Sequence, residues 1–138
     1  MAERMNRTRT ALIAAVIVVL CAASAWQFGR NTWMATQQSF ADEQTEIFSE
    51  MTGKATEALK RQPPDVKAAV GLLEYTHSYY PTGTKQTHGS PLDRIVERSR
   101  SVAESRIIEM LRDATGMDHG TDADDWIREL RNHAESDK

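Results

Sequence analysis

Segment 81–90, with the sequence PTGTKQTHGS, gathers residue types that can do chemistry. A lysine among glycines and threonines is typical of loops that hold phosphate groups. A phosphate-binding loop also needs a Gly-Lys-Ser/Thr ending and a preceding strand, and this segment has neither. We therefore expect a solvated loop and no nucleotide. The alternative is a loop that contacts a partner or an anion through Lys85 and His88.

A second candidate is the acidic turn, which we define as residues 118–125 and which carries four aspartates and His119. Counted from Asp118 as a calcium loop, the third position is Gly120. The sixth position, where the loop requires glycine, is Ala123. The calcium pattern therefore fails, and the simpler explanation is that acids favour the positive end of a helix that begins here.

The remaining polar residues form no catalytic pattern. The four histidines are scattered, no pair has metal-ligand spacing, and no Ser/His/Asp grouping can be assembled. Three arginines fall near one side of a predicted helix, namely Arg94, Arg98 and Arg112. This side is either a solvated face or a surface that binds an anionic partner. We predict no catalytic residue, no cofactor and no metal.

The elements that must position these segments begin with an uncharged run at 11–28, ALIAAVIVVLCAASAWQF. As a helix it would rise about 27 Å, close to the thickness of a bilayer core. Arg9 and Arg30 flank it. Basic residues precede the run and acidic residues follow it, so the positive-inside rule predicts a cytoplasmic N-terminus and an extracytoplasmic C-terminal part in the cell membrane.

Two other interpretations of this run stay open. Ala23-Ser24-Ala25 could serve as a signal-peptide exit, so that cleavage near Ala25 would release a secreted protein. Cys21 could be the lipidated residue of a lipoprotein, although no small residue directly precedes it. We favour an uncleaved signal-anchor, because the apolar run is long and ends in the aromatic residues Trp26 and Phe28.

The rest of the chain predicts helices and no strands. Apolar spacing and end signals place them at 31–62, 65–80, 91–115 and 122–133. We expect Asp65 to cap the second and Ser90 the third, with Asp93 reaching back in a capping box, and Thr121 with Asp124 to form another. The predicted fold is all-α, with a transmembrane helix, a long juxtamembrane helix and a small antiparallel bundle.

We divide the chain into four parts: a cytoplasmic basic N-terminus (1–10), the transmembrane helix (11–28), the juxtamembrane helix (29–62) and an extracytoplasmic helical domain (63–138). In the juxtamembrane helix, Trp33, Phe40 and Ile47 recur every seven residues. This stripe predicts either a coiled coil with a second copy or packing on the chain's own later helices.

The string from Thr115 to Trp126 resembles a TG-x-D-x-G-x-D-x-x-x-W ending of uncharacterised bacterial single-pass membrane proteins and helical-repeat proteins. The resemblance covers 12 residues. It implies a helix-turn-helix closure in which Gly116 and Gly120 turn the chain, an Asp or Thr caps the next helix, and Trp126 packs back. It implies no catalytic role.

These features predict a membrane-anchored, non-enzymatic interaction or scaffolding protein of the bacterial envelope. The net charge of −3, with acids concentrated after the apolar run, argues against nucleic-acid binding. Expected partners are membrane lipid and either a protein or a second copy bound through the juxtamembrane helix. The expected partner-contact residues are Tyr79, Gly83, Lys85 and His88. The alternative function is a ligand-binding or enzymatic domain in which 81–90 and the acidic turn converge.

Overall fold

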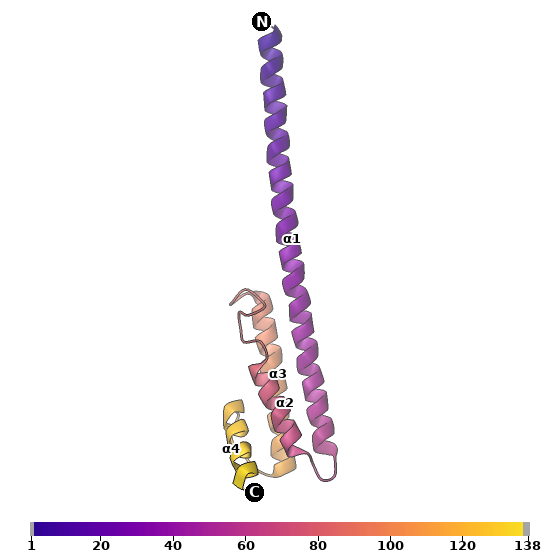
Figure 1. Ribbon diagram of the computed structural model, residues 1–138, viewed down its shortest axis with the longest axis vertical. Coiled ribbons are helices and arrows are strands. Elements are labelled where there is room, and N and C mark those ends of the chain that lie inside the picture. Colours follow the sequence, from indigo (N-terminus) through magenta and orange to yellow (C-terminus); the bar gives the residue numbers. More distant parts are fainter. Residues whose placement is uncertain (1, 137–138) are drawn as a thin grey trace. The chain divides into compact units, whose positions relative to one another are not determined.

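The protein is all-helical, as predicted. The computed structural model describes the backbone of residues 2–136 and the side chains of Arg9 and residues 12–132. No strand occurs within residues 2–136. The four helices, shown in Figure 1, are α1 (Ala2–Lys60), α2 (Val66–Ser78), α3 (Pro91–Thr115) and α4 (Ala123–Ser136).

The chain packs as two compact units, Met1–Gln37 and Gln38–Lys138. The division falls inside α1, within the part that we predicted as the juxtamembrane helix, 29–62. The reason is that the last part of α1 belongs to the core of the second unit. Phe48 and Ala55 of α1 are 1% and 0% exposed.

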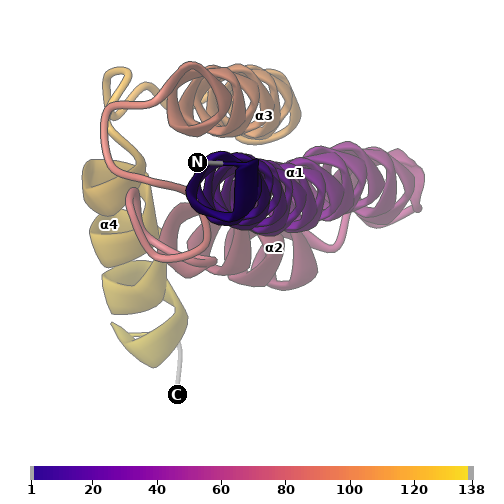
Figure 2. The ribbon, with the colours of Figure 1, turned by 90° about the horizontal axis from the view of Figure 1, so that it is seen from above.

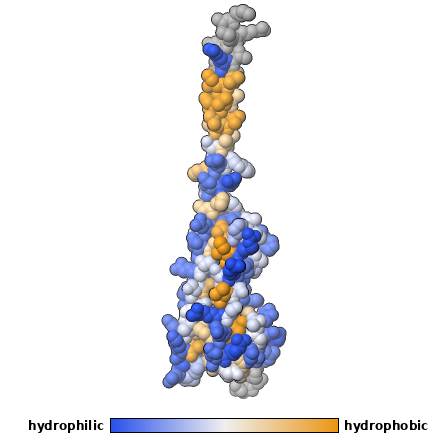
Figure 3. All heavy atoms as spheres, turned by 180° about the vertical axis from the view of Figure 1, so that it is seen from behind, coloured by the Kyte–Doolittle hydropathy of each residue, from blue (hydrophilic) through white to orange (hydrophobic). Residues whose placement is uncertain are grey.

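The first unit consists of helix alone. One stretch near its start is long and apolar enough to cross a membrane by length and composition, and none of that stretch is buried inside the protein. Figure 3 shows it as a continuous hydrophobic band. Soluble domains usually bury large aliphatic side chains. In this helix such side chains are exposed, namely Leu12, Ile13, Val16, Ile17, Val18, Val19 and Leu20.

In the second unit, α2 and α3 lie side by side. In Figures 1 and 2, α4 and the last part of α1 lie on opposite sides of this pair. Most of the core joins all four helices around Leu73, Ile107, Leu111 and Trp126. A smaller cluster of Ala41, Phe48, Val96 and Ala103 joins α1 to α3 further along.

Local end signals set most of the helix ends, as predicted. Asp65 Oδ1 accepts from Ala68 N at 2.9 Å. Ser90 Oγ accepts from Asp93 N at 3.1 Å, with Pro91 in the first turn of α3. Gly116 ends α3 in the left-handed conformation at φ 70°, a backbone geometry that glycine adopts without a steric penalty.

Helix α2 ends earlier than predicted, at Ser78 rather than residue 80, and Tyr80 adopts a positive φ of 41°. The physical reason lies in α3. The guanidinium of the buried Arg100 donates to the backbone carbonyls of His77, Tyr79 and Tyr80. These bonds satisfy carbonyls at the end of α2 that have no partner within the helix, so the chain can leave the helix before Pro81.

The predicted start of α4 is wrong by one residue. Asp122, rather than Thr121, precedes the helix, and its Oδ1 accepts from Asp124 N at 3.0 Å. The backbone carbonyl of Asp122 accepts from Trp126 N at 3.4 Å, which is the first turn of the helix. Both residue types can cap a helix, so sequence alone does not choose between neighbours.

The stripe of the juxtamembrane helix packs on the chain's own domain only in part. Trp33, in the first unit, is 61% exposed, whereas Phe40 and Ile47 in the second unit are half-buried. The same face of the helix continues toward the core of the second unit. Met51 and Ala55 are buried, and Leu59 packs against the core. Gln44, which interrupts the apolar spacing, is 3% exposed. Of the two interpretations of the stripe, packing on later helices is the one that this part of the structure shows.

Candidate functional site

The loop between α2 and α3 comprises residues 79–90 and so contains segment 81–90. It is built around a buried carboxylate from the first turn of α3. Asp93 is 3% exposed. Its Oδ2 accepts from Thr82 Oγ1 and from Gly89 N, both at 2.8 Å, and its Oδ1 accepts from Gly83 N at 2.9 Å. One carboxylate therefore ties the start and the end of the loop to the helix that follows.

This arrangement differs from the capping box that we predicted. The Ser90 oxygen caps α3 as expected, but the Asp93 carboxylate binds Gly89, Gly83 and Thr82. The backbone N of Ser90 instead donates to Thr87 O at 3.0 Å. The turn at Gly89, which has φ +72°, exposes other donors to the carboxylate.

The hydrogen bonds decide the charge state of Asp93. Burial by itself raises the pKa of this carboxyl, because a buried charge loses its hydration. The bonds from Gly89, Gly83 and Thr82 favour the charged form and outweigh burial, so the pKa lies below its ordinary value. Asp93 is therefore an ionised structural anchor at neutral pH.

The middle of the loop is fastened to α1. Lys85 Nζ lies 4.4 Å from the centre of the Phe40 ring and 4.3 Å from that of Tyr80, so the cation sits between two aromatic faces. Next to it, the buried Gln86 donates from Nε2 to Gln44 Oε1 at 2.7 Å. The loop is thus an ordered part of the domain.

Of the four predicted contact residues, three take part in holding this shape. Tyr79 packs edge-on against Phe48, and burial raises the pKa of its hydroxyl. Gly83 donates to Asp93, and its φ of +77° is in the region that favours glycine. His88 is the most open, with a side chain that is 78% exposed.

The acidic turn is organised in a similar way at the other end of α3. Asp118 Oδ1 accepts from Gly120 N at 3.0 Å and from Arg112 Nη2 at 2.9 Å. These two groups lower the pKa of Asp118. Trp126, which is 0% exposed, donates from Nε1 to Gly120 O at 2.9 Å. Gly116 and Gly120, both with positive φ, turn the chain, and the indole packs back on this turn.

The alternative function required the loop and the acidic turn to converge, and they do not. The loop precedes Pro91 and the acidic turn follows Thr115, so they lie at opposite ends of the 25-residue helix α3. That helix is about 37 Å long at 1.5 Å per residue. A shared pocket of ordinary size cannot span this separation, so this element of the alternative is wrong.

Some titratable side chains of different helices lie in contact. His77 of α2 lies between two carboxylates, with Nδ1 3.0 Å from Glu104 Oε1 of α3 and Nε2 3.5 Å from Asp124 Oδ1 of α4. Among the residues that the structure describes, no three His, Cys, Asp or Glu side chains are placed to hold one metal ion. This contact links three helices.

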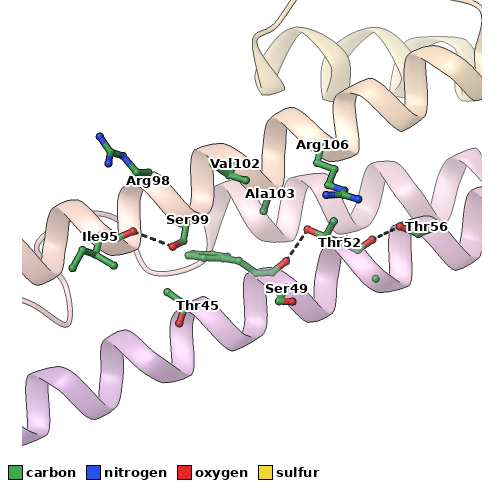
Figure 4. Close-up of a pocket in the computed structure, with 12 residues that line it drawn as sticks. Thr45, Ser49, Thr52, Thr56, Ile95, Arg98, Ser99, Val102, Ala103 and Arg106 are labelled. Carbon is green, nitrogen blue, oxygen red and sulfur yellow. Dashed lines mark hydrogen bonds between the residues drawn. The ribbon is translucent and has the colours of Figure 1, made fainter.

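A surface that sequence reasoning missed is an open groove of about 650 Å³ between α1 and α3. Figure 4 shows Thr45, Ser49, Thr52 and Thr56 along α1, facing a row on α3 that includes Ile95, Ser99, Val102 and Arg106. Phe48 lies against its base, and Ile95 and Val102 are 54% and 62% exposed. Ile95 and Val102 are seven residues apart in the sequence, and this spacing places them on one side of α3.

Comparison with family models, with curated proteins and with solved structures found no match for this chain.

Proposed function

We propose that the chain is a single-pass, membrane-anchored interaction protein of the bacterial envelope, without enzymatic activity. The short basic N-terminus lies in the cytoplasm. The second unit is displayed outside the membrane as a small helical bundle, in which α2 runs antiparallel to α1 and α3 antiparallel to α2. The proposed role is to bind another protein component at the membrane.

The observation that carries the proposal is the contrast in burial along α1. Near residue 17 the apolar side chains are exposed, whereas Phe48, Ala55 and Ala58 further along are buried in a core. Fully burying one large aliphatic side chain is worth about 1.5–3 kcal/mol, so leaving a run of them in water is strongly unfavourable. A bilayer removes this cost, and the helix satisfies its own backbone groups there.

The interaction role is supported by the ordered surfaces of the second unit. The loop is held by Asp93, Lys85 and Gln86, so it presents one conformation to a partner. Preorganisation of this kind reduces the entropic cost of binding. The groove between α1 and α3 is a second ordered surface, with exposed apolar side chains at its edge.

Membrane fractionation with protease shaving tests the anchor and its orientation. We expect the full chain to stay in membranes after alkaline carbonate washing, and a C-terminal tag to be digested in intact spheroplasts. Intact mass decides whether the chain is cleaved near Ala25. A tag that resists digestion until the cells are lysed would contradict the orientation, and a cytosolic chain would contradict the anchor.

A matched pair of substitutions sharpens this test. Val19→Lys places a charge near the middle of the span, where insertion costs about 2.5–3.5 kcal/mol. Gln27→Lys adds the same charge at the edge, where the side chain reaches the interface. We expect the first variant to lose membrane insertion and the second to retain it. Equal retention of both would contradict a span centred on this stretch.

A further inference from the structure

We propose that the open groove between α1 and α3 is the interface of a parallel homodimer, in which each α3 packs against the partner's α1. This inference rests on the proposed function and names the partner as a second copy of this chain. It differs from the predicted coiled coil, because the apolar face of α1 at Phe48, Met51 and Ala55 is already buried in the chain's own core.

The surface of the groove suits contact with another helix. Thr52, Thr56 and Ser99 donate their hydroxyls to carbonyls four residues earlier on their own helices, at 2.8–3.0 Å. These donors are satisfied before any partner arrives, so covering them carries little cost in lost hydrogen bonds. A Cβ added at Gly53 meets nothing within 4 Å, so the α1 wall is open to close approach.

The α3 wall of the groove is basic, whereas the outer side of α1, beside the groove, is acidic. The residues that line the groove include two arginines, Arg98 and Arg106, and no acid. Among the described residues neither arginine makes an ion pair, and both are exposed. The outer side of α1 carries exposed acids, and of these Glu46 and Glu57 make no ion pair within the described part of the chain.

The register of the helices brings these charges to matching levels. Helix α3 runs in the same direction as this part of α1 (Figure 1), and Ile95 and Arg106 line the same groove as Thr45 and Thr56. The Arg100 guanidinium lies 5.4 Å from the centre of the Phe48 ring. Arg98 and Glu46 each lie two residues before this contact, so they are near the same level. In addition, Glu46 and Gly53 are seven residues apart and lie on one row of α1.

In a two-fold symmetric dimer, this register places the basic side of α3 opposite the acidic side of the partner's α1. In a homodimer the same patch of both copies meets, so a contact from α3 to the partner's α1 occurs twice. In the proposed parallel homodimer, the second units of the two copies run in the same direction. A parallel pair then sets each Arg98 against an acid of equal level, Glu46, on the other copy, while Ile95 and Val102 are covered.

A charge swap in the full chain, reconstituted in lipid vesicles and followed by energy transfer between labelled copies, tests this interface. We expect the wild type to dimerise and R98E or E46R alone to raise the dissociation constant about 10-fold or more, because like charges then face each other. The double variant, R98E with E46R, should return to within about threefold of the wild type. Lys67→Glu, on exposed α2 away from the groove, is the matched control and should leave dimerisation unchanged.

Three results would overturn the inference. They are a wild type that stays monomeric at every protein-to-lipid ratio, a charge swap that fails to restore what the single changes remove, or a chain that is captured in native membranes only with a different polypeptide in the groove. Vesicle flotation is measured on the same samples. Chain that floats as a monomer contradicts the dimer alone, whereas chain that fails to float contradicts the membrane anchor.

Discussion

An aspartate carboxylate orders the chain at each end of α3, but the two carboxylates differ in burial. At each end a carboxylate accepts hydrogen bonds from a glycine N–H and has a lowered pKa, at Asp93 and at Asp118. The Asp93 side chain is 4% exposed and that of Asp118 is 68% exposed. The loop end therefore depends on a buried charge, whereas the turn end depends on the buried Trp126. The hydrogen bonds to Asp93 and to Asp118 are similar, but they contribute differently to stability because only Asp93 is buried.

The largest expected effect is at the turn end. Trp126→Ala removes the largest fully buried side chain of the core together with its bond to Gly120. We expect the free energy of unfolding to fall by about 3–5 kcal/mol, as for other buried aromatic residues. Urea unfolding of the full chain in detergent, followed by circular dichroism, measures this. A loss below 1 kcal/mol would mean that the turn end does not depend on the indole.

The next effect is at the loop end. Asp93→Ala leaves the donors of Thr82, Gly83 and Gly89 without their acceptor, and we expect a cost of about 2–3 kcal/mol. The same unfolding experiment measures it. The matched control is Asp113→Ala, an exposed carboxylate on α3, which should change stability by less than about 0.5 kcal/mol. Equal effects of the two changes would contradict the anchoring role of Asp93.

The pH dependence separates the two ends further. Because the pKa of Asp93 is lowered in the folded state, its contribution is complete above the unfolded carboxyl pKa, near 3.8, and is lost as the pH falls through the folded pKa. The stability difference between wild type and Asp93→Ala should therefore shrink with acidification below about pH 4. Unfolding midpoints measured from pH 7 downward test this. A difference that stays constant at acid pH would exclude the carboxylate as its source.

The smallest effect is expected for Asp118→Ala, because water and salt screen an exposed ion pair. The variant should unfold close to the wild type at low salt and coincide with it in 1 M NaCl. Thermal unfolding at the two salt concentrations checks this. A loss comparable to that of Asp93→Ala would remove the contrast between the two ends of α3.

The sequence predicted the features of the fold that depend on residues close together in the chain. The caps at Asp65 and Ser90, the glycine end at Gly116 and the all-helical class involve residues a few positions apart, and the structure confirms them. The contacts of the candidate site were less predictable. We proposed Lys85 as a partner contact, but its aromatic neighbour Phe40 is 45 positions away in the chain.

The sequence by itself determined the all-helical class, the helix ends at Asp65, Ser90 and Gly116, and which stretch is apolar enough for a bilayer, because capping and hydropathy depend on neighbouring residues. The tertiary structure decided that α2 ends at Ser78, that Asp93 holds the loop, that the loop and acidic turn are kept apart, and that Ile95 and Val102 line an open groove. Each of these depends on which helix faces which, and that follows from long-range packing of the core rather than from local pattern.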